Sequence, residues 1–296
     1  MCSKPIPFET SPLTSRFGAA CSGIDLRDVT ATHLYPELRT LFERESALLF
    51  RNQEIAPEDH IRLAKLFGPL EDRKSDERGP GADFKIPEVS NVLSDGTVTG
   101  AEDLHTLNLK ANQLWHTDST FLPVPALANI LIARVVTATG GETELASTRA
   151  AWRDMPETMR AKLRGKRARH RYSHSRARIS PDLANLPMFN KWDDQTWPAL
   201  WRNPVTGEDA IYIASHACAI EGMDPADGAA LIDDVIAFCT QPAYTYCHAW
   251  AKGDVLIWDE RATLHRGRPW NYAEPRALSS ICVSVTEADG LSAMRS

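Results

Sequence analysis

The segment Leu114-Trp115-His116-Thr117-Asp118 places an imidazole and a carboxylate two positions apart. Residues two apart on a β-strand point to the same side, so His116 and Asp118 can converge on one point while Thr117 points away. A second segment, Trp258-Asp259-Glu260-Arg261-Ala262-Thr263-Leu264-His265-Arg266-Gly267-Arg268, adds another imidazole and is followed by Arg276. A barrel that brings distant strands alongside each other would unite the two segments.

The combined side chains suit one kind of metal chemistry. Two His and one carboxylate on one face of an Fe(II) ion leave positions open for a bidentate 2-oxo acid and for O2. A lone His-x-Asp is weak evidence in a chain with nine histidines, so the surrounding motifs have to decide. The hypothesis at this point is an iron-dependent oxygenase.

Composition limits the class of protein. A chain of 296 residues with 43% hydrophobic and 24% charged residues is ordinary for a globular protein. The formal net charge of −6 argues against nucleic-acid binding. No apolar run approaches the roughly 18–20 residues that span a bilayer, and the first ten residues lack the apolar stretch of a secretory signal. Six scattered cysteines without a Cys-x-x-Cys fit reduced thiols. We therefore predict a cytoplasmic protein that binds a small molecule, and neither nucleic acid nor a membrane.

The pattern along the chain predicts an α+β fold with no linker, and therefore one domain over residues 1–296. Helices are expected at 34–41, 57–67 and 225–240. A charged, Gly/Pro-rich loop is expected at 71–84. Strands are expected at 47–50, 88–93, 127–136, 142–146, 168–173, 210–214, 244–250, 254–258, 263–265 and 276–285. The strands are expected to form a double-sheet barrel with helices packed outside it.

Several motifs together resemble one family. Trp115-His116-Thr117-Asp118-Ser119-Thr120-Phe121, Gly140-Gly141-Glu142-Thr143, Ala214-Ser215-His216-Ala217 and Trp258-Asp259 leading to His265-Arg266 are similar to motifs of the taurine dioxygenase / 2,4-dichlorophenoxyacetate dioxygenase family. The resemblance covers most of the chain. It implies a double-stranded β-helix (jelly-roll) core with flanking helices, with Fe(II) as cofactor and 2-oxoglutarate and O2 as cosubstrates. It also implies oxidation of a small organic acid or natural-product intermediate, with release of succinate and CO2. It leaves open hydroxylation, cleavage, desaturation or cyclisation, and whether the chain forms a homo-oligomer.

The resemblance also implies roles for particular residues. His116, Asp118 and His265 would bind iron and form the catalytic centre. Thr143 would hydrogen-bond 2-oxoglutarate, and Arg276 would pair with its distal carboxylate. Trp258 would lie beside the cosubstrate, although a tryptophan on a late strand usually fills core. Asn112 would contact the substrate, although it could merely cap or turn the chain.

The chain departs from the family at Ser280. Relatives have there a second arginine, which holds the anionic group of the substrate. A neutral serine cannot form that ion pair, so the substrate differs or its anion is held from elsewhere. This departure bears on the substrate rather than on the type of reaction.

Three further features remain open. His216 is the histidine outside the iron set most worth watching. The stretch 160–178 has nine Lys/Arg and no acid, which fits either a solvated helix followed by a charged edge strand or an electropositive rim that attracts anions. The irregular segments 71–84 and 174–198 are candidates for lids that shape the substrate site.

Two other classes of protein are weaker interpretations. A non-catalytic, metal-binding barrel protein of the same fold is the alternative function, and the complete set of iron and cosubstrate positions argues against it. A Ser-His-Asp hydrolase is disfavoured because no Gly-x-Ser-x-Gly elbow is present and Ser119 should lie on the strand face opposite Asp118.

Overall fold

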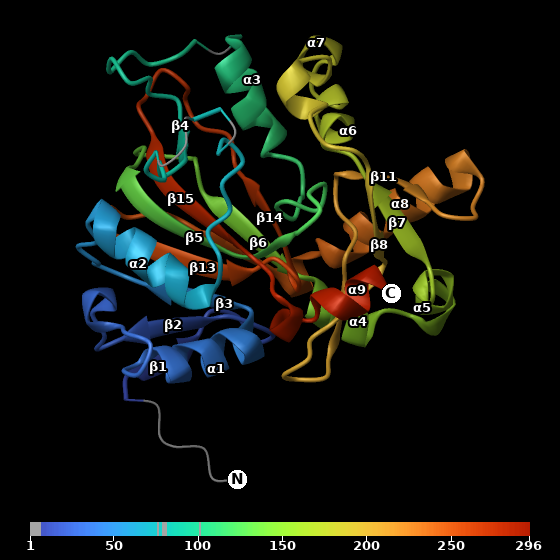
Figure 1. Ribbon diagram of the computed structural model, residues 1–296, viewed down its shortest axis with the longest axis horizontal. Helices are drawn as coiled ribbons and strands as arrows, with labels where there is room; N and C mark the ends of the chain where they lie inside the picture. Colours follow the sequence, from blue (N-terminus) through green and yellow to red (C-terminus); the bar gives the residue numbers. More distant parts are fainter. Residues whose placement is uncertain (1–6, 76, 79–81, 101) are drawn as a thin grey trace.

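A seven-stranded sheet is the largest element in the computed structural model, which describes residues 7–75, 77–78, 82–100 and 102–296 (Figure 1). Its strand order is β1-β2-β3-β13-β5-β15-β4, and neighbours are antiparallel except β2 and β3. The strands are β1 (Glu9–Pro12), β2 (Ala19–Ser22), β3 (Ala47–Phe50), β13 (Val255–Asp259), β5 (Ala126–Val135), β15 (Ala277–Ser284) and β4 (Glu88–Ser90). The strands from the two ends of the chain thus meet in one sheet.

Three smaller sheets accompany it. The first, in the order β12-β6-β14, consists of β12 (Thr245–His248), β6 (Thr143–Ser147) and β14 (Thr263–Gly267). The second, in the order β11-β7-β8, consists of β11 (Ala217–Ile220), β7 (Arg167–His170) and β8 (Gln195–Pro198). The third pairs β9 (Leu200–Arg202) with β10 (Asp209–Ile211). Among the described strands, the ladders do not join these sheets into a closed barrel.

Alternation along β13 explains how the large sheet is buried on both faces. Val255 and Ile257 belong to the core that also contains residues of the helices α1 (Tyr35–Glu45) and α2 (Pro57–Phe67). Leu256 and Trp258 belong to a second core, which includes Leu145 of β6. Because side chains alternate between the faces of a strand, one face of the sheet packs on helices and the other faces the β12-β6-β14 sheet.

The remaining helices lie outside these sheets (Figure 1). They are α3 (Leu104–Ala111), α4 (Thr148–Asp154), α5 (Glu157–Leu163), α6 (Tyr172–Ala177), α7 (Pro181–Ala184), α8 (Pro225–Cys239) and α9 (Leu291–Arg295). Short 3₁₀ turns occur at Leu26–Asp28, Pro187–Phe189, Pro242–Tyr244 and Glu287–Asp289. Helices α3, α6 and α7 gather at the same end of the molecule as β4. Among the described residues, no helix is both long and apolar enough to cross a membrane.

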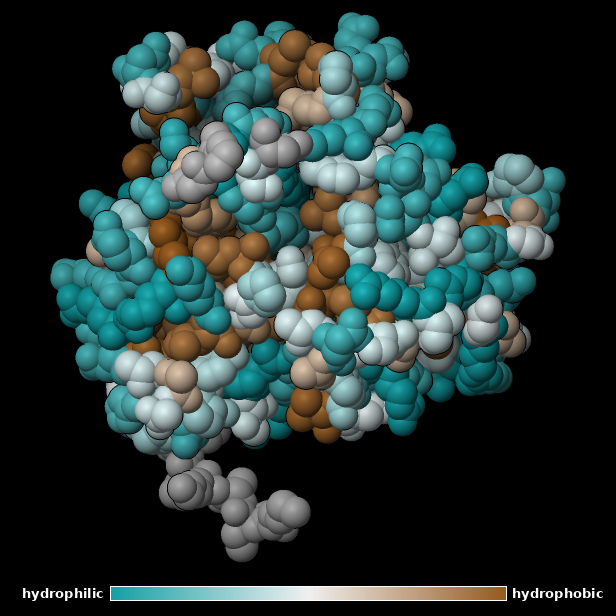
Figure 2. All heavy atoms as spheres, viewed as in Figure 1, coloured by the Kyte–Doolittle hydropathy of each residue, from teal (hydrophilic) through white to brown (hydrophobic). Residues whose placement is uncertain are grey.

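The face of the molecule in Figure 2 is mostly hydrophilic, and the hydrophobic side chains visible on it lie mainly towards its middle. Few large hydrophobic side chains are exposed among the described residues. One of them is Met188, which is 49% exposed and reappears below as part of the cavity wall.

The mixed α+β class predicted from the sequence is confirmed, and several elements agree closely with their predictions. The strand at 47–50 and the helix at 57–67 have the predicted bounds, and the helix predicted at 225–240 ends one residue earlier, at Cys239. The strand predicted at 168–173 is partly wrong, because it ends at His170 and α6 begins at Tyr172. The proposed edge strand in this basic stretch is also wrong, since β7 lies between β11 and β8.

Candidate active site

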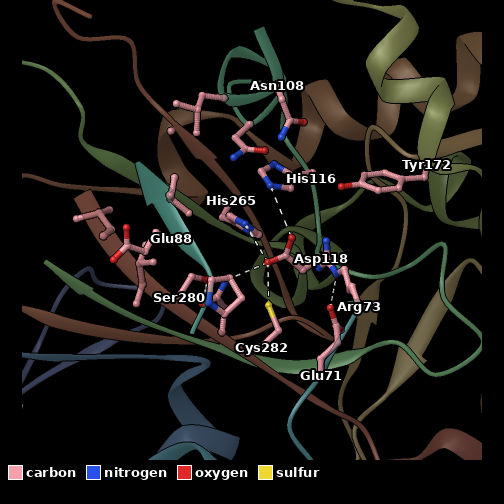
Figure 3. A pocket seen from close by; sticks show the side chains of 18 of the residues that line it. Glu71, Arg73, Glu88, Asn108, His116, Asp118, Tyr172, His265, Ser280 and Cys282 are labelled. Carbon is pink, nitrogen blue, oxygen red and sulfur yellow. Dashed lines mark hydrogen bonds and ion pairs between the residues drawn. The ribbon is translucent and has the colours of Figure 1, made fainter. Parts of the chain in front are cut away.

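His116, Asp118 and His265 lie together, although His265 is far from the other two in sequence. Their nearest ligand atoms are all within 4.8 Å of one another. Asp118 Oδ1 is 4.0 Å from His116 Nε2, and Asp118 Oδ2 is 3.8 Å from His265 Nε2 (Figure 3). The backbone explains the meeting, because the N–H groups of His116 and His265 each donate to the other's carbonyl oxygen, at 3.0 and 2.8 Å. Thr117 points away, and its hydroxyl donates to Thr263 O at 3.0 Å.

Hydrogen bonds orient two of these groups towards a metal. His116 Nδ1 lies 2.7 Å from Leu114 O, a position for an N–H that leaves the Nε2 lone pair unused. Asp118 Oδ2 accepts a hydrogen bond from Asn129 Nδ2 at 2.9 Å and is 3.3 Å from Cys282 Sγ. A metal would therefore meet side chains that are already held in place.

The protonation states also suit a metal. Burial lowers the pKa of His116 and lowers that of His265 to about 3, so both imidazoles are neutral near neutral pH. Burial alone would raise the pKa of the Asp118 carboxyl, but the nearby His265, His116 and Arg73 outweigh it and hold that pKa well below its usual range. Neutral imidazoles and a carboxylate are the forms that bind divalent metals.

Glu260 is a site residue that sequence reasoning missed. Its side chain is fully buried and accepts hydrogen bonds from the Asp118 backbone N–H at 2.9 Å and from Trp258 Nε1 at 2.7 Å. It also lies 3.6 Å from His265 Nδ1, which has no hydrogen-bond partner among the described residues. Burial, followed by the charge of Asp118, raises the pKa of the Glu260 carboxyl well above its usual value. Its position within the Trp258-Asp259-Glu260 segment, a carboxylate directly after an apolar strand, was the available signal.

Arg276 presents a buried positive charge to the same cavity. It is 4% exposed, and its Nε and Nη2 donate to Gly141 O at 3.2 and 2.7 Å. No carboxylate of a described residue forms an ion pair with it, and burial lowers its pKa to about 10. Gly141 has φ +72°, and a Cβ there would lie 2.7 Å from Arg276 Nε. This close approach is available only to glycine, and the unpaired guanidinium fits an acidic ligand.

The other residues predicted from the sequence also line this cavity. Thr143 is buried and accepts a hydrogen bond from Trp250 Nε1 at 3.0 Å, which leaves its hydroxyl hydrogen able to donate. Trp258 packs against His265 with ring centroids 4.7 Å apart. Asn112 follows the last residue of α3, and its backbone oxygen accepts from Gly267 N at 2.8 Å. Asn112 therefore ends a helix, and Trp258 fills core, while both also lie beside the cavity.

The cavity has a volume of about 760 Å³, within the range of small-molecule sites. Residues from both predicted lid segments line it, including Arg73 from one and Met188 and Trp192 from the other. His216 lines it too, 2% exposed, with its ring centroid 6.2 Å from that of His116.

Comparison with known proteins gives the class to which this site belongs. Residues 9–282 match the family described as "Taurine catabolism dioxygenase TauD, TfdA family". The chain is 33% identical over 271 residues to the alpha-ketoglutarate-dependent 2,4-dichlorophenoxyacetate dioxygenase of Cupriavidus pinatubonensis, covering 90% of this chain and 94% of the relative. It is 32% identical over 279 residues to the (S)-phenoxypropionate/alpha-ketoglutarate-dioxygenase of Sphingobium herbicidovorans, covering 92% and 93%. The crystal structure of AAD-2 in complex with Mn(II) and N-oxalylglycine superposes with a TM-score of 0.87 at 29% identity, covering 94% of this chain and 98% of that chain.

The chain therefore belongs to the TauD/TfdA family of α-ketoglutarate-dependent dioxygenases. It is an oxidoreductase that uses 2-oxoglutarate (α-ketoglutarate) and acts on a small molecule, as the sequence predicted.

Proposed function

We propose that the chain is an Fe(II)- and 2-oxoglutarate-dependent dioxygenase that oxidises a small organic acid. The observation that carries the proposal is the meeting of three metal-ligand side chains with the unpaired Arg276 guanidinium in one cavity. Because the relatives named above act on phenoxyalkanoic acids, acids of that size are the first candidates. Hydroxylation is the basic reaction, and cleavage, desaturation and cyclisation are its variants.

His116, Asp118 and His265 are the proposed iron ligands, in the two-imidazole, one-carboxylate set that Fe(II) accepts. When bound, Fe(II) supplies the activation of O2, coupled to conversion of 2-oxoglutarate into succinate and CO2. Asn129 and the Leu114 carbonyl hold the Asp118 and His116 side chains in position, and Glu260 holds the backbone of Asp118.

Arg276 and Thr143 are the proposed cosubstrate residues. The Arg276 guanidinium offers two parallel N–H groups to the distal carboxylate of 2-oxoglutarate, and Thr143 offers a hydroxyl proton. Trp258 is proposed to lie beside the cosubstrate in the cavity, where its ring packs against His265 and its N–H donates to Glu260. Asn112 is proposed to contact the substrate at the edge of the cavity. Surrounding buried side chains exclude water from the reacting groups.

The arrangement of the sheets around the site is also part of this proposal. We propose that the seven-stranded and β12-β6-β14 sheets form the two halves of a double-stranded β-helix, with the site between them. The chain is proposed to act as one domain over residues 1–296. A homo-oligomer and a cytoplasmic location stay predictions.

The test is substrate-dependent release of succinate. The purified chain is incubated with Fe(II), ascorbate, 2-oxoglutarate and a panel of phenoxyalkanoic and other organic acids, and products are identified by mass spectrometry. We expect succinate release that at least one acid stimulates, and its loss in Asp118→Ala. Tight iron binding by Asp118→Ala, without turnover by the wild-type chain, would instead support a non-catalytic metal-binding protein.

A further inference from the structure

The cavity contains more positive charge than 2-oxoglutarate needs. Most of the arginines that line it are paired with carboxylates of described residues. These pairs are Arg73 with Glu71, Arg78 with Asp72, and both Arg266 and Arg268 with Glu144. Arg176 differs, because it is 5% exposed and forms no ion pair with any carboxylate in the part of the chain that the structure describes. It shares that property with Arg276.

The contacts of Arg176 hold the guanidinium without neutralising it. Nη1 donates to Ser175 Oγ at 3.0 Å and Nη2 to the Tyr172 hydroxyl at 3.3 Å, while Nε has no acceptor among the described residues. The guanidinium carbon lies 4.5 Å from the ring centroid of Tyr172 and 5.2 Å from that of Phe189. Aromatic faces attract a cation but add no negative charge, so the site remains cationic.

Arg176 packs on a side chain, Tyr172, that reaches towards the metal-ligand side chains. Tyr172, its neighbour on α6, extends towards His116 with its hydroxyl leading (Figure 3). The Tyr172 ring lies 5.7 Å from the His216 ring, which is 6.2 Å from the His116 ring, measured between centroids. In the view of Figure 3, Ser280 lies on the other side of Asp118 from Tyr172.

We propose that Arg176 is the specificity-determining residue that binds the anionic group of the primary substrate. The inference rests on the proposed function, because it takes Arg276 to be occupied by 2-oxoglutarate. Two acids bound in one cavity require two available cations, and Ser280 cannot supply one. The structure assigns the second cation to Arg176 on α6, instead of to an arginine at position 280 on β15.

Aromatic side chains beside Arg176 indicate what the substrate carries besides its charge. The Phe121 and Tyr172 rings stack with centroids 3.8 Å apart, and Trp192 lies 5.7 Å from Phe121. Met188 adds another apolar side chain to the cavity lining. The substrate class is therefore a carboxylic acid with an apolar, ring-bearing body that packs against these side chains.

The experiment uses protein loaded with Mn(II) and N-oxalylglycine, so that the cosubstrate position is filled. Calorimetry compares the binding of 2,4-dichlorophenoxyacetate with that of its uncharged carboxamide. We expect the acid to bind about 10- to 100-fold more tightly than the amide, as a charge-assisted pair requires. Arg176→Gln should abolish this preference. The matched control Arg178→Gln, which removes an arginine whose side chain is 43% exposed, should retain it.

The variants distinguish this inference from the proposed function. N-oxalylglycine binding, measured first, should be lost in Arg276→Gln and should stay within about twofold of wild type in Arg176→Gln. Failure of the wild-type chain to bind N-oxalylglycine counts against the proposed function. Normal N-oxalylglycine binding, together with equal affinity for acid and amide in the wild type or an unchanged preference in Arg176→Gln, overturns the role of Arg176.

A conservative variant covers the case in which Arg176→Gln does not fold. Arg176→Lys keeps the charge but loses the planar pair of donors, so affinity for the acid should fall by about 10-fold while affinity for the amide stays unchanged. Acid affinity equal to that of the wild type in folded Arg176→Lys would overturn the inference.

Discussion

Ser280, where the resemblance led us to expect an arginine, has a structural role of its own in this chain. Its hydroxyl donates to Asn129 Oδ1 at 3.0 Å, and Asn129 Nδ2 donates to Asp118 Oδ2 at 2.9 Å. The serine is therefore linked through Asn129 to the carboxylate that the metal needs. This bond needs a short side chain, and the longer side chain of an arginine at this position could not make it in the same way.

This linkage predicts an order of effects on metal binding. Asn129→Ala removes the amide that orients Asp118, and we expect the affinity for Mn(II) to fall by about 10- to 100-fold. Ser280→Ala leaves the amide in place but frees it to rotate, so its effect should be smaller. Calorimetric titration measures both, with the exposed Asn271→Ala as control. A larger loss in Ser280→Ala than in Asn129→Ala would contradict the linkage.

At the scale of elements, the turn between β5 and β6 brings the backbone against Arg276. Gly141 has φ +72° and leaves no room for a Cβ beside the guanidinium. Gly165 has a similar φ of +69°, but a Cβ there would meet nothing within 4 Å. The two glycines therefore separate the cost of the backbone conformation from the cost of the contact.

We expect Gly141→Ala and Gly165→Ala each to lower the free energy of unfolding by about 1–2 kcal/mol, the usual cost of a left-handed residue with a side chain. Gly141→Ala alone should also displace Arg276 and weaken 2-oxoglutarate binding by about 10-fold or more. Urea unfolding and calorimetry measure the two effects. Equal 2-oxoglutarate affinity in the two variants would show that the close approach has no functional role.

Elements with strong local signals were predictable from the sequence, and those set by tertiary contacts were not. Helix α2 begins at Pro57 with acids in its first turn and ends before Gly68, so both boundaries follow from local chemistry. Helix α6 is only six residues long and has no apolar stripe, so the sequence predicted a continued strand there.

The same distinction applies to the site. His116 and Asp118 were predictable as a pair from their motif, but the strand expected around them is wrong, because His116 forms only an isolated bridge with His265 and Asp118 lies in a turn. Asn129 was missed because its role depends on the register that pairs it with Trp258 across β5 and β13, which local sequence does not specify. The sequence did not single out Arg176, which was only one of the nine lysines and arginines in the stretch 160–178.

For the whole molecule, a metal at the site would join segments that the backbone ladders leave in separate sheets. His265 lies on β14, and Asp118 is held from β5 of the seven-stranded sheet. A ligand that binds only the folded state stabilises it by mass action. At a free Mn(II) concentration about 100 times the Kd, the free energy of unfolding should rise by about 2.7 kcal/mol.

Thermal or urea unfolding with Mn(II) and then with EDTA measures this gain, which the chelator should reverse. Asp118→Ala serves as the control, since it lacks one ligand. A gain in Asp118→Ala as large as that in the wild type would place the stabilising metal elsewhere.

The buried histidines make the metal-free protein sensitive to acid. Burial lowers the pKa of several of them below the usual 6.5, to about 4 for His60 and about 3 for His170 and His265. Between about pH 6.5 and 4 the unfolded chain therefore binds more protons than the folded one, and stability falls as pH falls. Each such histidine contributes up to about 1.4 kcal/mol per pH unit.

We expect the free energy of unfolding in EDTA to drop by several kcal/mol between about pH 7 and pH 5, as measured by urea titration at each pH. Asp118 does not contribute in this window, because its carboxyl pKa is depressed and it titrates only at lower pH, whereas the raised pKa of Glu260 offsets part of the loss. An unfolding free energy that is flat across this range would contradict neutral burial of these imidazoles.

The place of β15 within the seven-stranded sheet bears on when the site can form during synthesis. The ribosome makes His116, Asp118 and His265 before it makes residues 277–284, yet this last strand inserts between β5 and β4 rather than adding at an edge. Until it emerges, β5 has an open edge, and Asn129 and Asp118 lack Ser280 and Cys282. We therefore expect the metal site to gain its full set of supporting contacts only after β15 has been synthesised.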